Sequence, residues 1–417
     1  MNNLINRTLV LAMAGATAYT GAVSAATFVG EGTAAGKQCV SLAVNNSGVV
    51  VGTCTPGTTS GPSVAWVAST AGTEVPLPPL VSGQGCTAVA IDNNGQIAGS
   101  CKMADNRATA VIWNSATPGA TPGAAPVALQ AVSVLGTGLL PEARTVISAF
   151  NQSDVLAGAS LSGTGDATAV LWFSGSTAPL QVSALHDNCF PADINNTPIN
   201  GVPTVALDCP NPASGNTVAK VVQKTGLLGT LVTTPLTTPA GSTGCSVSSV
   251  NNAVQLLGTC HFSAPDVPQA VYWPNPSATP VQLSSISGVS GASRITGLRL
   301  NNNGHAVVSY QDSNGHHLLA FWTPSSGSTQ LIPPLAGGTH IGFVDLSDND
   351  VVALTSENAG EHHQAATWTS ATGTVAIPQF GGGQESGLTA ISPNGTYVAG
   401  GAEDSTGTDD AVVATLP

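Results

Sequence analysis

Cysteines and histidines are the residues of this chain whose types and spacing could do chemistry. Three of the four cysteine pairs bracket similar segments, CVSLAVNNSGVVVGTC, CTAVAIDNNGQIAGSC and CSVSSVNNAVQLLGTC, at the same interval. Turn residues fall midway between the cysteines, so an antiparallel hairpin would place each pair side by side, within reach of a disulfide. The predicted bridges join Cys39 to Cys54, Cys86 to Cys101, Cys189 to Cys209 and Cys245 to Cys260. Because no Cys-x-x-Cys motif occurs, we expect these disulfides to stabilise the fold rather than to take part in redox catalysis.

Two pairs of adjacent histidines suggest metal binding. DSNGHHLLAFW contains His316 and His317, and ENAGEHHQAATW contains His362 and His363 at the same distance before a tryptophan. Imidazole and carboxylate groups suit zinc or copper, so these four histidines are candidate metal ligands. The alternative is that one unit was copied from the other and its histidines are solvated. The full set of candidate ligand-binding residues is His316, His317, His340, His362, His363, Asp312, Glu361 and Arg294.

Other cofactor and catalytic motifs are missing from the sequence. DSNG and AEDSTGTDD are acidic, but neither completes a calcium loop, so we expect solvated loops and no cofactor. No G-x-S-x-G, H-E-x-x-H or phosphate-binding glycine motif occurs. A pair of carboxylates in a central mouth could still cleave a glycan, but the sequence singles out no such pair. We therefore predict no catalytic residues.

An internal repeat positions these residues. All six tryptophans share one sequence context, as in AVIW and AVLW, and a Trp-free copy, VAKVVQ, fills the longest gap between them. Each unit has four short β-branched segments, with turns such as NNSG, DNNG and NNNG between the first two. Eight such units start near residues 39, 86, 145, 189, 245, 295, 341 and 386.

The last unit lacks its fourth strand, and residues 27–33 supply a spare strand before the first unit. We predict an all-β, eight-bladed β-propeller of four-stranded antiparallel blades, closed by this N-terminal strand and spanning residues 26–417 as one domain. A linear β-solenoid is the alternative, but it would not explain the strand missing at one end and spare at the other. The tryptophans are expected in the core between blades.

The repeats resemble the extracellular HAF repeat family. The resemblance rests on AVAIDNNGQIAGS, TAISPNGTYVAGG, the Ala-Val-x-Trp strand, and the segments LIPPLAGG and AIPQFGGG. The literal His-Ala-Phe triplet is absent, and the nearest match is HHLLAFW. The resemblance implies an exported repeat protein and no particular activity.

Residues 1–25 read as a signal peptide cleaved near Ala25, so we expect a secreted or periplasmic protein. No later segment is long and apolar enough to predict insertion into a membrane. The net charge of −13 argues against nucleic acid as a partner. We expect a monomer that binds an extracellular glycan or protein.

Antiparallel connections alternate between the two faces of a propeller, and seven of the eight histidines fall on the face opposite the NNSG-type turns. Varied polar loops on a rigid frame commonly bind ligands. The leading hypothesis is a non-catalytic binding module for a glycan or another extracellular ligand. The alternatives are a polysaccharide hydrolase or lyase, and a structural envelope or adhesion protein.

Overall fold

The computed structural model describes residues 26–30, 37–56, 61–70, 72, 74–113, 125–133, 144–225, 229–263 and 267–417. The predicted signal peptide, residues 1–25, lies outside the described residues, as do residues 31–33 of the predicted closing segment. None of the described segments is a helix with the length and apolarity needed to cross a bilayer.

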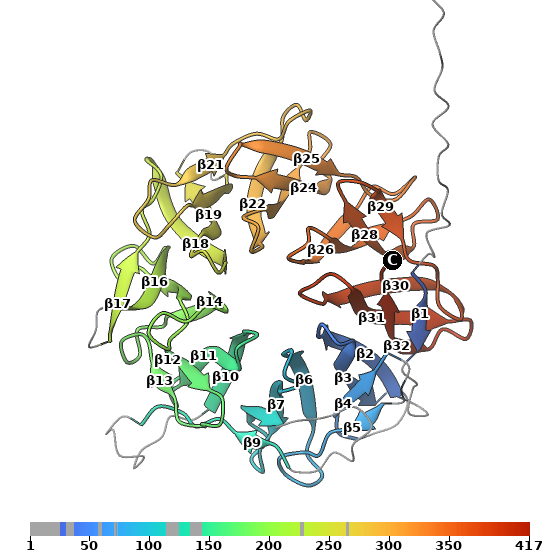
Figure 1. The fold of residues 1–417 in the computed structure, drawn as a ribbon, viewed down its shortest axis with the longest axis horizontal. Helices are drawn as coiled ribbons and strands as arrows, with labels where there is room; N and C mark the ends of the chain where they lie inside the picture. The colour runs from blue at the N-terminus through green and yellow to red at the C-terminus, as the bar shows by residue number, and fades with distance from the viewer. Residues whose placement is uncertain are drawn as a thin grey trace, which may run out of the picture.

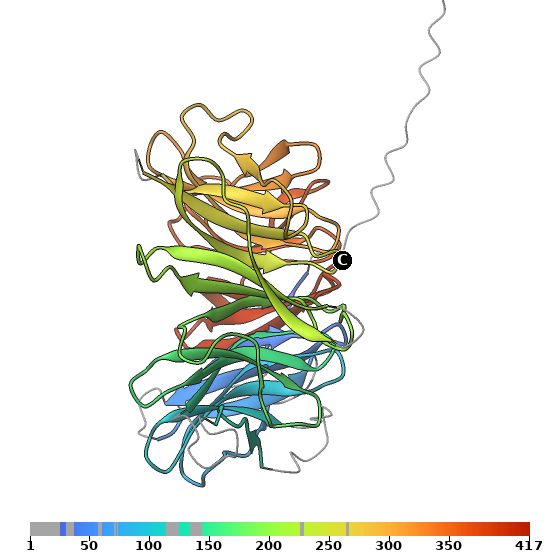
Figure 2. The same cartoon turned by 90° about the vertical axis from the view of Figure 1, so that its left-hand side faces the viewer.

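Eight four-stranded antiparallel sheets are arranged radially in a ring, which confirms the predicted propeller (Figure 1). The centre of the ring, where ends of the inner strands border a cavity, is here called the channel. Viewed from the side, the blades stack as inclined layers (Figure 2). Within each of blades 1 to 7, the first strand in sequence is innermost and its successors follow outward.

The strands of the first four blades follow in sequence order. Blade 1 has β2 (Lys37–Val44), β3 (Val49–Pro56), β4 (Val64–Ser69) and β5 (Val75–Pro76). Blade 2 has β6 (Cys86–Ile91), β7 (Ile97–Lys102), β8 (Ala108–Trp113) and β9 (Val127–Ala128). Blade 3 has β10 (Arg144–Phe150), β11 (Val155–Leu161), β12 (Ala167–Phe173) and β13 (Leu180–Gln181). Blade 4 has β14 (Phe190–Ile194), β15 (Val205–Pro210), β16 (Thr217–Thr225) and β17 (Thr230–Pro235).

The second half of the ring repeats this order until the last blade. Blade 5 has β18 (Ser242–Val250), β19 (Leu256–Phe262), β20 (Gln269–Trp273) and β21 (Val281–Leu283). Blade 6 has β22 (Ser293–Leu300), β23 (Ala306–Gln311), β24 (His317–Thr323) and β25 (Ser328–Ile332). Blade 7 has β26 (Ile341–Leu346), β27 (Val352–Glu357), β28 (His363–Thr369) and β29 (Gly373–Ala376). Blade 8 has β30 (Gly382–Ile391), β31 (Tyr397–Asp404), β32 (Asp409–Thr415) and β1 (Phe28–Gly30).

The N-terminal strand closes the ring, as predicted. Strand β1 pairs antiparallel with β32, so that Phe28 lies opposite Ala414 and Gly30 lies opposite Val412. The outer edge of β32 is thereby paired rather than left open to another chain.

The tryptophans form the core between blades, as predicted. All six are at most 3% exposed. Trp113 of blade 2 packs in one cluster with Val67 of blade 1, and its indole N–H donates to the carbonyl of Pro78 in the connection between those blades, at 3.0 Å. Trp172 and Trp273 donate in the same way to the connections before their blades. These three indoles therefore both fill the seam between blades and hold the preceding loop, whereas the buried indole N–H groups of Trp66 and Trp322 have no partner among the described residues.

All four predicted disulfides are present. Each bridge ties together the first two strands of one blade, with Cys189 directly before β14, and the paired Cα atoms lie 4.0 to 4.1 Å apart. In blade 1, Cys39 and Cys54 occupy directly opposed positions of the hairpin. The bridges indicate an oxidising, non-cytoplasmic environment.

The fourth strand of blade 1 is short. Its ladder with β4 covers Val75–Pro76, and the Leu77 N–H also donates to the carbonyl of Ala65, at 2.8 Å. Pro76, Pro78 and Pro79 lack the N–H groups that a longer ladder would require.

A β-bulge in the inner strand explains a recurring glycine. In blade 2 the register between β6 and β7 shifts between Ala88 and Ala90, which leaves Val89 as the extra residue. The bulge brings the Thr87 carbonyl against the next strand, where a Cβ on Gly99 would lie 2.1 Å from that oxygen. A Cβ added to the glycine at the equivalent position of blades 1, 3, 5 or 8 would lie 1.9 to 2.1 Å from a backbone carbonyl oxygen.

The turns between first and second strands form a continuous ring of hydrogen bonds, here called the turn ring. Backbone N–H groups donate to side-chain oxygens of the next blade at 2.7 to 3.1 Å, in the order Asn46, Asn93, Gln152, Asn196, Asn252, Asn302 and Asp348. The Asp348 N–H then donates to the Pro393 carbonyl, and the Asn394 N–H returns to Asn46. All eight blades are thus linked at one end of the channel.

We expect Gly99→Ala to lower the free energy of unfolding by about 2 to 4 kcal/mol, because the new methyl group must displace a backbone carbonyl. Urea unfolding monitored by tryptophan fluorescence measures this loss. Gly163→Ala is the matched control, since no atom lies within 4 Å of its Cβ position. Equal stability of the two variants would contradict the role assigned to the bulge.

Candidate functional site

The eight candidate ligand-binding residues lie in loops and strand ends on one face of the ring, here called the histidine face. Asp312, His316 and His317 lie at the β23–β24 turn, and Glu361, His362 and His363 lie at the β27–β28 turn. His340 precedes β26, and Arg294 lies at the start of β22. The turns between second and third strands and the connections between blades both lie on the face opposite the turn ring.

Histidine–carboxylate pairs are the main interactions on this face. The Nδ1 atom of His316 lies 3.1 Å from Asp312 Oδ2, and that of His340 lies 3.0 Å from Glu357 Oε2. The hydrogen bond with His340 is the principal reason why the pKa of Glu357 is lowered.

A second group of histidines shares one carboxylate, that of Glu385. His362 Nδ1 lies 2.7 Å from one of its oxygens, and His363 Nδ1 lies 3.5 Å from the other. Glu385 and Glu357 are thus partners that the sequence analysis did not identify.

The aromatic contact of His316 is with His340, not with another doubled histidine. Their ring centroids lie 5.9 Å apart at an interplanar angle of 74°. Arg294 and Glu361 are exposed, have positive φ angles of 51° and 63°, and form no ion pair with another described residue.

One group of three potential metal donors occurs in the described part of the chain: Cys39, Cys54 and Glu74, whose donor atoms lie within 4.8 Å of one another. Both sulfurs are in the disulfide, so they do not offer thiolates to a metal. Glu74 Oε2 lies 3.4 Å from Cys54 Sγ. Burial, reinforced by the negative charge of Asp410, raises the pKa of Glu74 to about 8.

The channel provides a further site, formed at the penultimate positions of the inner strands. Four blades have alanine there: Ala43, Ala90, Ala149 and Ala390. The other four blades, which are consecutive in the ring, have Asp193, Ser249, Arg299 and Asp345. One half of the channel is therefore polar and charged, whereas the other half has small apolar residues.

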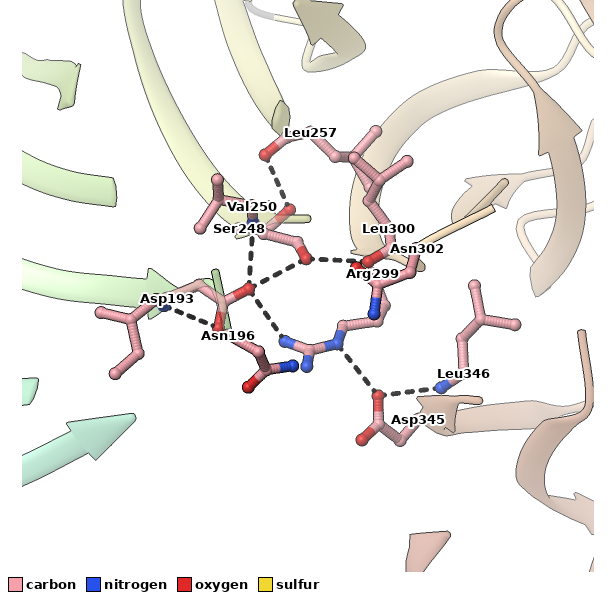
Figure 3. A network of polar contacts seen from close by, with 12 residues as sticks. Asp193, Asn196, Ser248, Val250, Leu257, Arg299, Leu300, Asn302, Asp345 and Leu346 are labelled. Carbon is pink, nitrogen blue, oxygen red and sulfur yellow. Dashed lines mark hydrogen bonds and ion pairs between the residues drawn. The ribbon is translucent and has the colours of Figure 1, made fainter. Parts of the chain in front are cut away.

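Arg299 lies between two carboxylates from blades on either side (Figure 3). Its Nη1 atom is 3.1 Å from Asp193 Oδ2, and its Nε atom is 3.3 Å from Asp345 Oδ1. The negative charge of Asp193 is the main reason why the pKa of Arg299 is raised, so the guanidinium stays charged.

The two carboxylates differ in their environment. Asp193 Oδ2 accepts hydrogen bonds from Ser249 Oγ, the Val250 N–H and Arg299, while Oδ1 accepts the Ile194 N–H. The side chain of Asp193 is only 10% exposed, compared with 39% for Asp345.

Asp345 accepts the Leu346 N–H and the Arg299 Nε–H at Oδ1, and its Oδ2 atom has no partner among the described residues. Desolvation among the surrounding inner strands raises the pKa of Asp345 despite the opposing charge of Arg299.

These groups line a cavity of about 110 Å³, which turn-ring residues also border. Asn196 and Asn252 use their side-chain oxygens in the turn ring, and their NH₂ groups have no partner among the described residues. Arg299 Nη2 is also without a described partner. Donors from three blades and the free oxygen of Asp345 therefore border one cavity.

This site was not predicted from the sequence, although the aligned first strands contain a pattern that indicates it. When the first strands are aligned on their turns, charged residues replace alanine in ADI, LRL and VDL. A charge at a position that is otherwise alanine marks a channel-facing residue.

Comparisons with known proteins show the fold alone. No protein-family model matches the chain, and no curated protein is similar to it in sequence. The β-propeller domain of the Trilobed protease from Pyrococcus furiosus aligns with a TM-score of 0.52 and 10% identity, over 85% of this chain and 99% of that domain. Prolyl oligopeptidase B from Galerina marginata aligns with a TM-score of 0.54 and 10% identity, over 90% of this chain and 56% of the peptidase.

Replacing Arg299 with methionine is expected to lower the free energy of unfolding by about 1 to 3 kcal/mol, because two carboxylates then lose their counter-charge in a partly solvated channel. Urea unfolding at neutral pH measures the change. Arg107→Met, which removes an exposed ion pair with Asp105 on the histidine face, should leave the free energy of unfolding almost unchanged, because solvent screens that pair. A larger effect at Arg107 than at Arg299 would contradict this assignment.

The raised pKa of Glu74 predicts a particular dependence of stability on pH. Because the folded chain keeps this proton up to about pH 8 whereas an unfolded chain releases it near 4.5, stability should fall as pH rises through this interval. Glu74→Gln should flatten the decline in melting temperature between pH 5 and pH 8, measured without reductant. Glu361→Gln, at an exposed site, is the control, and an unchanged slope in Glu74→Gln would refute the prediction.

Proposed function

We propose that this chain is an exported, non-catalytic binding module of the HAF-like repeat type, which holds a neutral glycan in the polar half of its channel. The observation that carries the proposal is the convergence, around Arg299, of donors and an acceptor that have no partner in the described part of the chain. A rigid frame already holds these groups, so little ordering would be required on binding. Export is supported by the four disulfides and by the leader-like residues 1–25.

The charges in the cavity favour an uncharged ligand. Asp193, Asp345 and Asp348 surround a single arginine, and the whole chain has a net charge of −13. An anionic ligand would therefore meet repulsion at long and short range. A sugar hydroxyl both donates and accepts, so adjacent hydroxyls can donate to Asp345 Oδ2 while accepting from Arg299 Nη2.

The same geometry supports binding rather than hydrolysis. Glycosidases commonly need two available carboxyl groups, one as acid and one as base or nucleophile. Asp345 has a free oxygen and a raised pKa, as an acid would, but the two oxygens of Asp193 accept four hydrogen bonds between them. Asp193 thus holds the site together and is poorly placed to accept a further proton or attack a sugar.

The test is calorimetric titration of the mature protein with neutral β-glucan, xylan and mannan oligosaccharides, and with oligogalacturonate as an acidic comparison. We expect at least one neutral ligand to bind, and Asp345→Asn and Asn196→Ala each to weaken its binding about tenfold or more by removing a hydrogen bond to it. Asp105→Asn on the histidine face is the matched control. Each variant is checked for folding by its melting temperature.

Mass spectrometry of the same mixtures detects cleavage. Product formation that Asp345→Asn abolishes would replace the proposal with a hydrolase. Preference for oligogalacturonate, or neutral binding unaffected by both channel variants, would also overturn it. Absence of binding to every neutral oligosaccharide would shift the function to protein binding or to a structural role.

A further inference from the structure

We propose that His316 and His340 form a two-histidine site for a divalent transition metal, Zn²⁺ or Cu²⁺, on the histidine face between blades 6 and 7. The two rings come from different blades, and their centroids lie 5.9 Å apart. This pairing differs from the one that the doubled histidines suggest in the sequence.

Hydrogen bonding fixes which nitrogen of each ring can bind a metal. Nδ1 of His316 faces Asp312 at 3.1 Å, and Nδ1 of His340 faces Glu357 at 3.0 Å. Because a carboxylate can only accept, a neutral ring that hydrogen-bonds to it has its proton on Nδ1 and its lone pair on Nε2. The Nδ1 atom of His340 also lies 2.9 Å from Thr339 Oγ1, which can accept from the same N–H. Metal-ligating histidines are typically held by a carboxylate in this way. Neither Nε2 atom has a partner among the described residues.

The supporting carboxylates are themselves held in place. Asp312 Oδ1 accepts the N–H groups of Asn314 and His316, at 2.9 and 2.8 Å. Glu357 Oε2 accepts the hydroxyl of Thr339 at 3.1 Å. The Glu357 N–H donates to the His340 carbonyl. Both rings are thus oriented without a metal, which lowers the entropic cost of binding.

The ring separation fits a shared ion. A metal about 2.1 Å from Nε2 lies about 3.2 Å from the centroid of that imidazole. Two such rings bound at a tetrahedral angle would have centroids about 5.2 Å apart, and rings bound in line would be about 6.4 Å apart. The observed 5.9 Å falls between these limits.

Charge also favours a cation here. Asp312 and Glu357 contribute two negative charges directly behind the rings, which a divalent ion would neutralise. The side chains of His316 and His340 are 37% and 56% exposed, so water can complete the coordination. Imidazole nitrogen is a favourable ligand for both Zn²⁺ and Cu²⁺.

The experiment is titration of the full mature chain with Zn²⁺ by calorimetry, together with electron paramagnetic resonance of one equivalent of Cu²⁺. We expect one site per chain with nitrogen hyperfine structure from two imidazoles. His316→Ala and His340→Ala should each abolish that site. Asp312→Asn and Glu357→Gln keep both imidazoles and should weaken binding about 10- to 100-fold.

His362→Ala and His363→Ala are matched controls, because these neighbours share the carboxylate of Glu385 instead. Melting temperatures without metal show whether each variant folds. Loss of the site in the controls but not in His340→Ala would overturn the assignment. So would full retention in Glu357→Gln, or the absence of a stoichiometric site in the wild-type chain.

Discussion

The turn ring is the constraint on which the rest of the structure depends. Each blade donates a backbone N–H to a turn of the next, and the last link returns from Asn394 to Asn46. Because every inner strand leads into one of these turns, the ring brings the ends of those strands to a common level. Residues at one position before the turn therefore meet in the channel, although Asp193 and Arg299 are 106 residues apart. The candidate site follows from this alignment rather than from any local motif.

Much of the fold could be predicted from the sequence because its signals are local and repeated. Asn45 receives the N–H groups of Ser47 and Val49 on its side-chain oxygen, as a residue at the start of such a turn should. Cysteines at equal distances from a turn must lie opposite each other, and the four bridges follow. A strand missing in the last blade and spare before the first indicated how the ring closes.

The site was harder to predict because its contacts join residues that are distant in the sequence, both within a blade and between blades. The partner of His340 is Glu357, which lies opposite it at the open end of the β26–β27 hairpin, and the partner of His362 is Glu385 in the next blade. Neither spacing matches a motif. Arg299 replaces an alanine of the repeat, but its two carboxylate partners become evident only when β14 and β26 are placed on either side of it. Glu74 likewise has an unremarkable sequence context, and only folding places it against a disulfide.

The pairing of β1 with β32 has a consequence for how the chain can fold. Joining residues 28 and 414 closes a loop of nearly the whole chain, at an entropic cost of about 5 kcal/mol for a flexible polymer. A strand of three residues cannot offset that cost alone, so the pair becomes stable only when the intervening blades have already brought the ends together. Blade 8 is thus the last to assemble during biosynthesis. Its strand β1 is synthesised first and stays unpaired until residues 409–415, which form β32, have been synthesised. A chain that crosses a membrane before folding would meet the same order of events on the far side.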